Sequence, residues 1–141
     1  MTAQEEVLDA ARRLIEAFGS HDVPAYFGSF AADATFVFHN HPVPLASRAD
    51  YEAVWREWEQ EGFHVEGCTS SDQSVHILTP EVAVFTHSVS TRLAGDDVPQ
   101  RERETIVFRR DPSGRWLGVH EHLSVDPVDP AGEADRAVLA P

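Results

Sequence analysis

The sequence predicts an α+β fold, in which a cone of three N-terminal helices packs on a strongly curved antiparallel β-sheet. Apolar residues recur at helical spacing only in the first part of the chain, up to Gly62. Beyond Gly62 this period is lost, and four long segments rich in β-forming residues follow one another through short turns. Strands joined by such turns are antiparallel neighbours, and helices that precede a run of strands are typical of the α+β class.

The first helix is expected to begin after Thr2, because Thr2 and Glu5 have the spacing of a capping box. Apolar side chains then recur on one helical face, at Val7, Leu8, Ala11, Leu14, Ile15 and Phe18. Gly19 is expected to end this helix. A short second helix should follow, with Asp22 as its N-cap and Pro24 in its first turn.

Residues 34–39 are rich in β-forming side chains and predict the first strand. Pro42 and Pro44 make the segment after it a loop, because proline cannot continue a regular element there. A third helix is expected between Ser47, its N-cap, and Gly62. Its apolar stripe consists of Tyr51, Val54, Trp55 and Trp58. A stripe of this kind either belongs to the core or forms the wall of a ligand pocket.

The four long strands are expected at residues 63–78, 82–93, 100–110 and 115–125. A strongly curved sheet must bury its concave face, and three helices cannot fill that face completely. We therefore expect a pocket inside the cone. The single domain should span residues 1–125, and residues 126–141 should form a loosely ordered tail that contains acidic residues and prolines.

Composition limits the classes of partner. The chain has 141 residues, with 11 Lys and Arg against 24 Asp and Glu, so its formal net charge is −13. An acidic surface repels phosphate, so we expect binding to neither nucleic acid nor an anionic membrane. No apolar run is long enough for a membrane span, and the N-terminus lacks the layout of a signal peptide. The sequence therefore predicts a cytoplasmic protein.

The C-terminal half contains a pattern that resembles the association domain of calcium/calmodulin-dependent protein kinase II. That domain has a segment E-T-x-V-aromatic, then a turn, then W-x-x-V-H-x-H-x-S. The matching residues here run from Glu104 to Phe108 and from Trp116 to Ser124. The order of elements also resembles the SnoaL-like and ketosteroid-isomerase-like families of the nuclear-transport-factor-2-like superfamily, which have a cystatin-like fold. The resemblance implies a ligand-binding pocket in the cone and a homodimer.

One departure from the association domain concerns the ligand. The pocket of that domain resembles an anion site lined by arginines from three strands. Two of the arginine positions fall on Ile106 and Leu123, and the third falls near His87 or Ser88. Because no arginine stands at these positions, anion binding is not expected. We expect a more apolar pocket and a small apolar ligand or substrate.

Two carboxylates are candidates for acid–base chemistry. The resemblance implies that Leu123 faces the pocket, because a pocket arginine aligns with it. Glu121 lies on the same strand face as Leu123, because side chains alternate along a strand. Glu104 shares a face with Ile106 and should point the same way. Burial raises the pKa of a carboxyl group, so two carboxylates in one pocket can divide the roles of acid and base. The alternative is that both are exposed or ion-paired with Arg92, Arg101 or Arg103.

Histidines supply further candidates. A one-residue bulge would replace Glu121 by His122 as the pocket residue. His39, His76 or His87 could act as an acid–base group, although a lone histidine is more often structural. His39 and His41, and His120 and His122, form two His-x-His pairs that could ligate zinc. The association domain has one such pair without a metal, so we expect no metal and no cofactor.

The predicted site has two parts. The candidate catalytic residues are Glu121, His122, His87 and Glu104. The expected pocket lining consists of Phe38, His39, Tyr51, Trp55, Ile106, Leu123 and Ser124. Tyr26 or Tyr51 could donate a hydrogen bond to a ligand carbonyl group, and the sequence leaves open which of them faces inward.

Three functions remain open at this point. The first is a small-molecule pocket protein that acts as a metal-free acid–base enzyme, of the isomerase, dehydratase or cyclase type, on an apolar carbonyl compound. The second is a non-catalytic association module, with Trp116 in the exposed sheet face that contacts a second subunit. The third is a carbonic-anhydrase-like or metal-dependent activity. One class of carbonic anhydrase resembles this fold and has an H-H-S-S segment where this chain has Glu121-His122-Leu123-Ser124.

Overall fold

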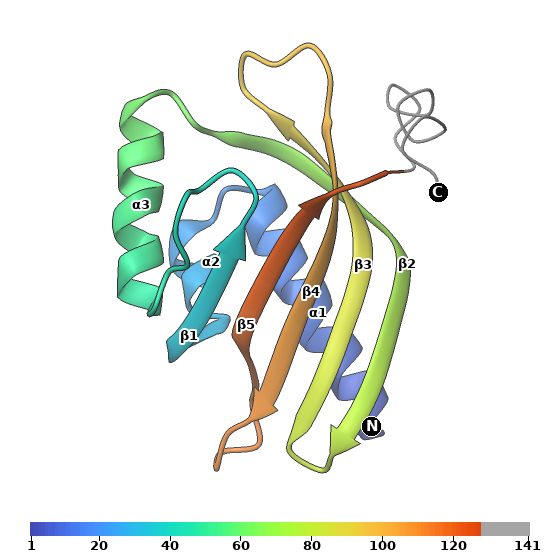
Figure 1. Ribbon diagram of the computed structural model, residues 1–141. Helices are drawn as coiled ribbons and strands as arrows, with labels where there is room; N and C mark the ends of the chain where they lie inside the picture. Colours follow the sequence, from blue (N-terminus) through green and yellow to red (C-terminus); the bar gives the residue numbers. More distant parts are fainter. Residues whose placement is uncertain (128–141) are drawn as a thin grey trace, which may run out of the picture.

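The computed structural model describes residues 1–127, and it confirms the predicted α+β architecture (Figure 1). Three helices lie against one side of a curved five-stranded sheet. The elements are α1 (Ala3–Gly19), α2 (Val23–Phe27), β1 (Phe30–Phe38), α3 (Arg48–Gln60), β2 (Val65–Thr79), β3 (Val82–Leu93), β4 (Gln100–Arg110) and β5 (Trp116–Val125). Helix α1 packs on β2 and β3, and α3 packs on β1. The cone between them is the space available for a ligand.

The sheet has the strand order β1-β5-β4-β3-β2. The four long strands β2 to β5 are antiparallel neighbours, as predicted. Strand β1 differs, because it pairs with β5 in parallel. The prediction of a wholly antiparallel sheet was therefore wrong for this strand. The turn rule holds only for strands that follow each other, whereas β1 and β5 lie far apart in the chain.

Local signals placed the helix ends well, with one exception. Thr2 Oγ1 accepts a hydrogen bond from the Glu5 amide at 3.1 Å, and the capping box is complete. Gly19 is the last residue of α1, as expected, but it does not take the left-handed conformation of a glycine that follows a helix; His21 does, at φ 55°. A Cβ atom at Gly19 would lie 3.1 Å from Cys68 Cβ. The glycine therefore serves the close approach of α1 to β2.

A β-bulge in β5 changes which residues face the helices. His120 pairs with Val107, whereas Gly118 pairs with Phe108, so Val119 has no partner on β4. The bulge turns both Trp116 and Glu121 inward, although simple alternation put them on opposite faces. Trp116 is 5% exposed, and its Nε1 donates a hydrogen bond to Glu6 of α1 at 3.1 Å. The expectation of an exposed Trp116 at a subunit contact is therefore wrong.

The described residues leave part of the predicted tail untested. Residues 128–141, which make up most of the predicted tail, lie outside them. Within residues 1–127, no helix is both long enough and apolar enough to cross a membrane. The core is rich in aromatic side chains, and its fully buried members include Phe30, Phe36, Trp55, Phe85 and Phe108.

Candidate functional site

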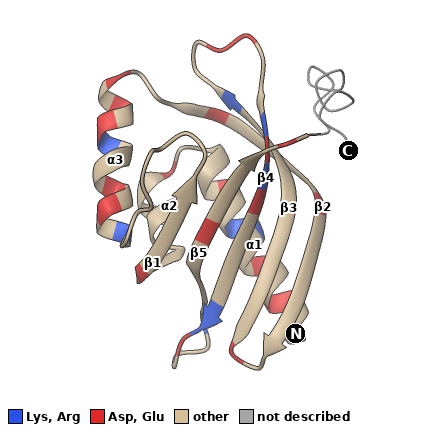
Figure 2. Ribbon diagram, viewed as in Figure 1, with Lys and Arg blue, Asp and Glu red and all other residues tan. Residues whose placement is uncertain are grey.

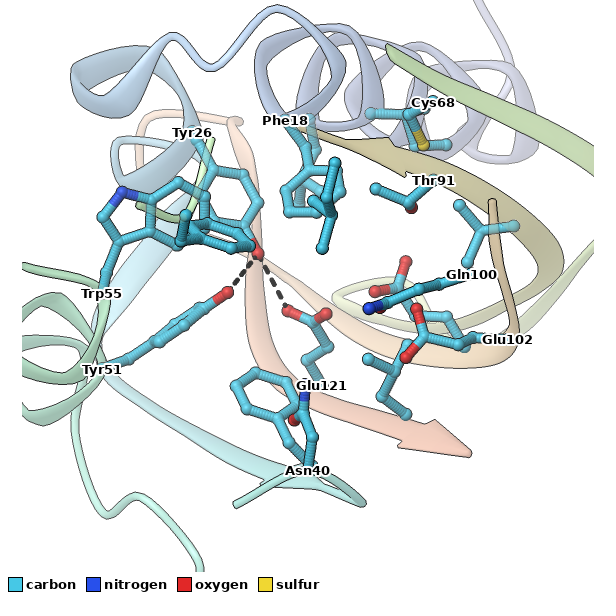
Figure 3. Close-up of a pocket in the computed structure, with 18 of the residues that line it drawn as sticks. Phe18, Tyr26, Asn40, Tyr51, Trp55, Cys68, Thr91, Gln100, Glu102 and Glu121 are labelled. Carbon is cyan, nitrogen blue, oxygen red and sulfur yellow. Dashed lines mark hydrogen bonds between the residues drawn. The ribbon is translucent and has the colours of Figure 1, made fainter. Parts of the chain in front are cut away.

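A pocket opens inside the cone, between the helices and the concave face of the sheet (Figure 3). Most of its wall is apolar or aromatic. These side chains are Leu14, Ile15, Phe18, Tyr26, Phe38, Tyr51, Trp55, Trp58, Phe63, Val89, Leu93 and Leu123. The cavity volume is about 60 Å³, several times the roughly 10–15 Å³ that one water needs. The pocket is therefore narrow, and a ligand that enters it must be slender.

Two carboxyl groups lie side by side on the pocket wall. Glu104 and Glu121 stand on the neighbouring strands β4 and β5, one diagonal step apart, because Glu104 pairs with Leu123 and Glu121 pairs with Ile106. Figure 2 shows acidic residues within β4 and β5, where most of the surrounding sheet is uncharged. Glu121 is 3% exposed, and the two carboxyl groups share a hydrogen bond. Such a bond requires one proton between them.

The environment assigns that proton to Glu121. Burial raises the pKa of Glu121 well above its ordinary value, and the neighbouring charge of Glu104 raises it further. Burial acts on Glu104 in the same direction, but hydrogen bonds from Glu121 and His87 outweigh it and lower the pKa of Glu104. The pair therefore holds one neutral carboxyl group, at Glu121, and one carboxylate, at Glu104.

A chain of polar groups from β3 and β2 supports the carboxylate. His87 pairs directly with Glu104 across the β3–β4 ladder, and its Nε2 lies 2.7 Å from Glu104 Oε1. The other ring nitrogen, Nδ1, lies 2.6 Å from Ser70 Oγ, which accepts a hydrogen bond from Gln73 Nε2 at 2.8 Å. The His87 side chain is fully buried. The imidazole ring is therefore fixed on both sides and holds the Glu104 carboxylate in place.

Two tyrosine hydroxyl groups complete the inner end of the pocket (Figure 3). Tyr26 Oη lies 2.9 Å from Tyr51 Oη and donates a hydrogen bond to Glu121 Oε1 at 3.4 Å. Burial raises the pKa of both tyrosines, so both stay protonated. The bond to Glu121 is long and therefore weak. A ligand oxygen could replace Glu121 as the acceptor for Tyr26.

The structure brings most of the predicted site residues together. Those that line the pocket are Glu121, Glu104, His87, Phe38, Tyr51, Trp55 and Leu123. His122 and Ser124 lie on the opposite face of β5, where His122 is exposed and Ser124 is partly exposed. They face away from the pocket because the bulge lies before Glu121 and not after it. Ile106 is buried in the core and does not line the pocket. These three expectations were wrong.

Some pocket residues were missed. Glu102 lines the pocket and is 6% exposed. It stands two residues before Glu104 on the same strand face, so the period of two that selected Glu104 also pointed to it. Asn40 and Gln100 are exposed and line the pocket near its mouth, and nothing in the sequence signalled them. His39 was expected in the lining but lies at the rim, where its Nε2 is 2.5 Å from Glu102 Oε2.

The His-x-His pairs serve other contacts. His120 Nδ1 lies 2.8 Å from Thr35 Oγ1, and the rings of His120 and His122 are 6.4 Å apart on the face away from the pocket. Burial and the neighbouring His122 lower the pKa of His120. His39 contacts Glu102, and His41 is half-buried. In the described part of the chain, no three His, Cys, Asp or Glu side chains form a cluster that could hold a metal ion.

Cys68 gives a chemical reporter for the pocket wall. Burial raises the pKa of its thiol to about 11. At pH 8 the thiolate fraction is therefore about a hundredfold lower than that of an unperturbed thiol. We expect iodoacetamide to alkylate the native protein at least that much more slowly than the protein unfolded in urea, as measured by mass spectrometry. Equal rates in the two states would show that Cys68 is exposed and the pocket wall is open.

Comparisons with known proteins agree with this architecture. The SnoaL-like domain family matches residues 7–128. A ketosteroid isomerase-like protein from Erwinia carotovora atroseptica is 16% identical, with 89% of this chain and 96% of that chain covered and a TM-score of 0.75. A protein from Xanthomonas campestris, provisionally named as a calcium/calmodulin-dependent protein kinase II association domain, is 18% identical, with 91% of each chain covered and a TM-score of 0.75.

An NTF2-like protein of unknown function from Pseudomonas putida is 19% identical, with 94% of each chain covered and a TM-score of 0.74. No curated protein matches the sequence. At these identities the solved structures show a shared fold, and the resemblance drawn from the sequence is confirmed at that level. Since the family match covers residues 7–128, from α1 through β5, and includes every residue that lines the pocket, the chain belongs to the SnoaL-like domain family.

Proposed function

We propose that this protein is an acid–base enzyme that moves a proton between carbon atoms of a small apolar carbonyl compound. The observation that carries the proposal is the carboxyl pair, in which Glu104 is ionised and Glu121 is neutral at the wall of an aromatic pocket. Two titratable groups whose environments separate their pKa values are the usual arrangement of a general base and a general acid. The sequence left open which of the two carboxyl groups is the base, and the pKa directions favour Glu104.

The proposed step begins with the carbonyl oxygen of the substrate between Tyr26 and Glu121, whose hydroxyl groups donate to it. Glu104 takes the proton from the α-carbon, and the electrons of that C–H bond move to the carbonyl oxygen, which becomes an enolate. Glu104 then returns the proton to a different carbon and the carbonyl group re-forms. When Glu121 turns its hydrogen bond from Glu104 to the substrate, Glu104 loses a stabilising donor and becomes a stronger base.

A simple substrate tests this proposal. A one-ring β,γ-unsaturated ketone should be converted to its conjugated isomer, which absorbs in the near ultraviolet. A positioned general base contributes roughly 10²- to 10⁴-fold, so the initial rate should exceed that in buffer containing acetate at equal carboxylate concentration. Deuterium uptake at the α-carbon, followed by NMR in D₂O, reports the same proton transfer when the double bond does not move. The absence of both signals with ketones that bind would contradict the proposal.

The other functions have less support. The association module was assigned a contact surface around Trp116, and that side chain is buried against α1. The carbonic-anhydrase-like activity was suggested by the segment that contains His122 and Ser124, and both side chains lie on the face away from the pocket. The homodimer and the cytoplasmic location remain predictions.

A further inference from the structure

The outer half of the pocket contains a buried hydroxyl group that the proposed proton transfer does not use. Thr91 is 3% exposed, and its Oγ1 has no oxygen or nitrogen atom as a hydrogen-bond partner among the residues that the structure describes. Its neighbour across the β2–β3 ladder is Cys68, whose thiol accepts a hydrogen bond from Thr91, and sulfur is only a weak acceptor. A buried hydroxyl group normally has a partner, because its removal from water is unfavourable. Thr91 therefore lacks an oxygen or nitrogen atom that would complete its surroundings.

Thr91 and the residue that holds the carboxyl pair lie on the same strand. Thr91 and His87 both line the pocket from β3, four residues apart along the strand. At about 3.3 Å per residue their Cα atoms are roughly 13 Å apart. Val89 lies between them on the same face and also lines the pocket. The cavity thus has a polar inner end, an apolar middle and a polar outer end.

The other polar groups of the outer end are already engaged or exposed. Glu102 is held by His39 at 2.5 Å, and Gln100, which pairs with Thr91 across the β3–β4 ladder, is exposed at the mouth. Figure 3 shows the hydroxyl oxygen of Thr91 on the side of its side chain that faces Gln100. Thr91 is therefore the buried outer group that a ligand atom inside the pocket can satisfy.

We propose that Thr91 is a ligand-binding residue, and that the ligand is a slender, elongated molecule with two polar ends. Its carbonyl group lies against Tyr26 and Glu121, and a hydroxyl or second carbonyl oxygen at the far end pairs with Thr91 Oγ1. The apolar stretch between them passes Val89 and the aromatic wall. The assignment of the carbonyl end rests on the proposed function, whereas the Thr91 end rests on a buried hydroxyl group that has no oxygen or nitrogen partner.

A pair of matched probes tests this proposal in the full chain. One is an unbranched methyl ketone, and the other is the same ketone with a hydroxyl group at its far end, long enough to reach from Tyr26 to Thr91. Binding is followed by tryptophan fluorescence, because Trp55 and Trp58 line the pocket. The variants are Thr91→Val, which keeps the shape of the side chain, and Thr86→Val, an exposed position on the same strand.

We expect the wild-type protein to bind the hydroxylated ketone roughly two- to tenfold more tightly, the range of one net hydrogen bond. The ratio of the two affinities should fall to about one in Thr91→Val and stay unchanged in Thr86→Val. The Tm of Thr91→Val should equal or exceed that of the wild type, because the substitution removes a buried hydroxyl group whose only partner is a weakly accepting thiol. A structural role for the hydroxyl would instead lower Tm.

Several results would overturn the proposal. They are equal affinity for the two ketones in the wild type, an unchanged ratio in Thr91→Val, and no binding of either ketone. Failure of the proposed function has a different signature. In that case the ketones bind with the expected ratio, but their α-carbons take up no deuterium.

Discussion

Replacing Glu104 by Gln should abolish most of the activity, whereas replacing Glu121 by Gln should have a much smaller effect. A carboxylate that acts as the general base cannot be replaced by an amide, so Glu104→Gln should lower the isomerisation rate roughly 10²- to 10⁴-fold. Glu121 is neutral in the resting pocket and acts as a hydrogen-bond donor. A glutamine amide is also neutral and also donates, so Glu121→Gln should stay within roughly tenfold of the wild-type rate.

The comparison separates the two carboxyl groups although they are in contact. Far-ultraviolet circular dichroism and Tm should show both variants folded, since each substitution preserves the shape of the side chain. Equal losses in the two variants would contradict the assignment of base and acid. A larger loss in Glu121→Gln would assign the role of base to Glu121 instead.

The pH profile gives an independent check on the base. Activity requires ionised Glu104, and the pKa of Glu104 is lowered from its ordinary value of 4.5. The wild-type rate should therefore stay constant as pH falls from neutrality to about 4.5 and decline only below it. His87, Glu121, Glu102, Tyr26 and Tyr51 all face or neighbour this carboxylate, and removing the His87 hydrogen bond should move the decline to higher pH. His87→Phe is the variant that removes it while keeping a ring.

Much of this fold follows from local rules in the sequence. The capping box at Thr2, the N-caps at Asp22 and Ser47 and the glycine after α3 are local signals, and the structure has each of them in place. The strands β3 and β4 have the predicted bounds, because turn residues mark both ends of each. The pocket was expected because three helices cannot fill the concave face of a curved sheet, and the family resemblance implied the same pocket.

The site was predictable only in part, because its geometry depends on contacts between distant segments. Trp116 faces inward together with Glu121 because of the bulge at Val119, and a bulge leaves no mark in an alternating sequence. The meeting of Tyr26 on α2 with Tyr51 on α3 depends on helix packing, so the sequence left both tyrosines open. The contact of His87 with Glu104 could have been found by aligning β3 and β4 from their short turn, since that register places them opposite each other.

Glu121 should also make the stability of the protein depend strongly on pH. Its pKa is raised in the folded state above the ordinary value of 4.5, so the folded protein holds a proton that the unfolded chain releases. The stabilisation from this proton is fully present below pH 4.5 and is lost as pH rises toward the folded pKa. Glu104 acts in the opposite sense: its contribution is present above pH 4.5 and is lost as pH falls through its lowered pKa.

The variant Glu121→Gln isolates this effect, because it keeps a neutral hydrogen-bonding group and removes the titration. Its free energy of unfolding relative to the wild type should rise by about 1.4 kcal/mol per pH unit above about 4.5, until the folded pKa is passed. Urea unfolding between about pH 5 and pH 8 measures the difference. Glu57→Gln, at an exposed position on α3, is the matched control and should show no such slope. If Glu121→Gln and the wild type lose stability in parallel, then Glu121 is ionised in the folded protein, and the pocket contains two carboxylates instead of an acid and a base.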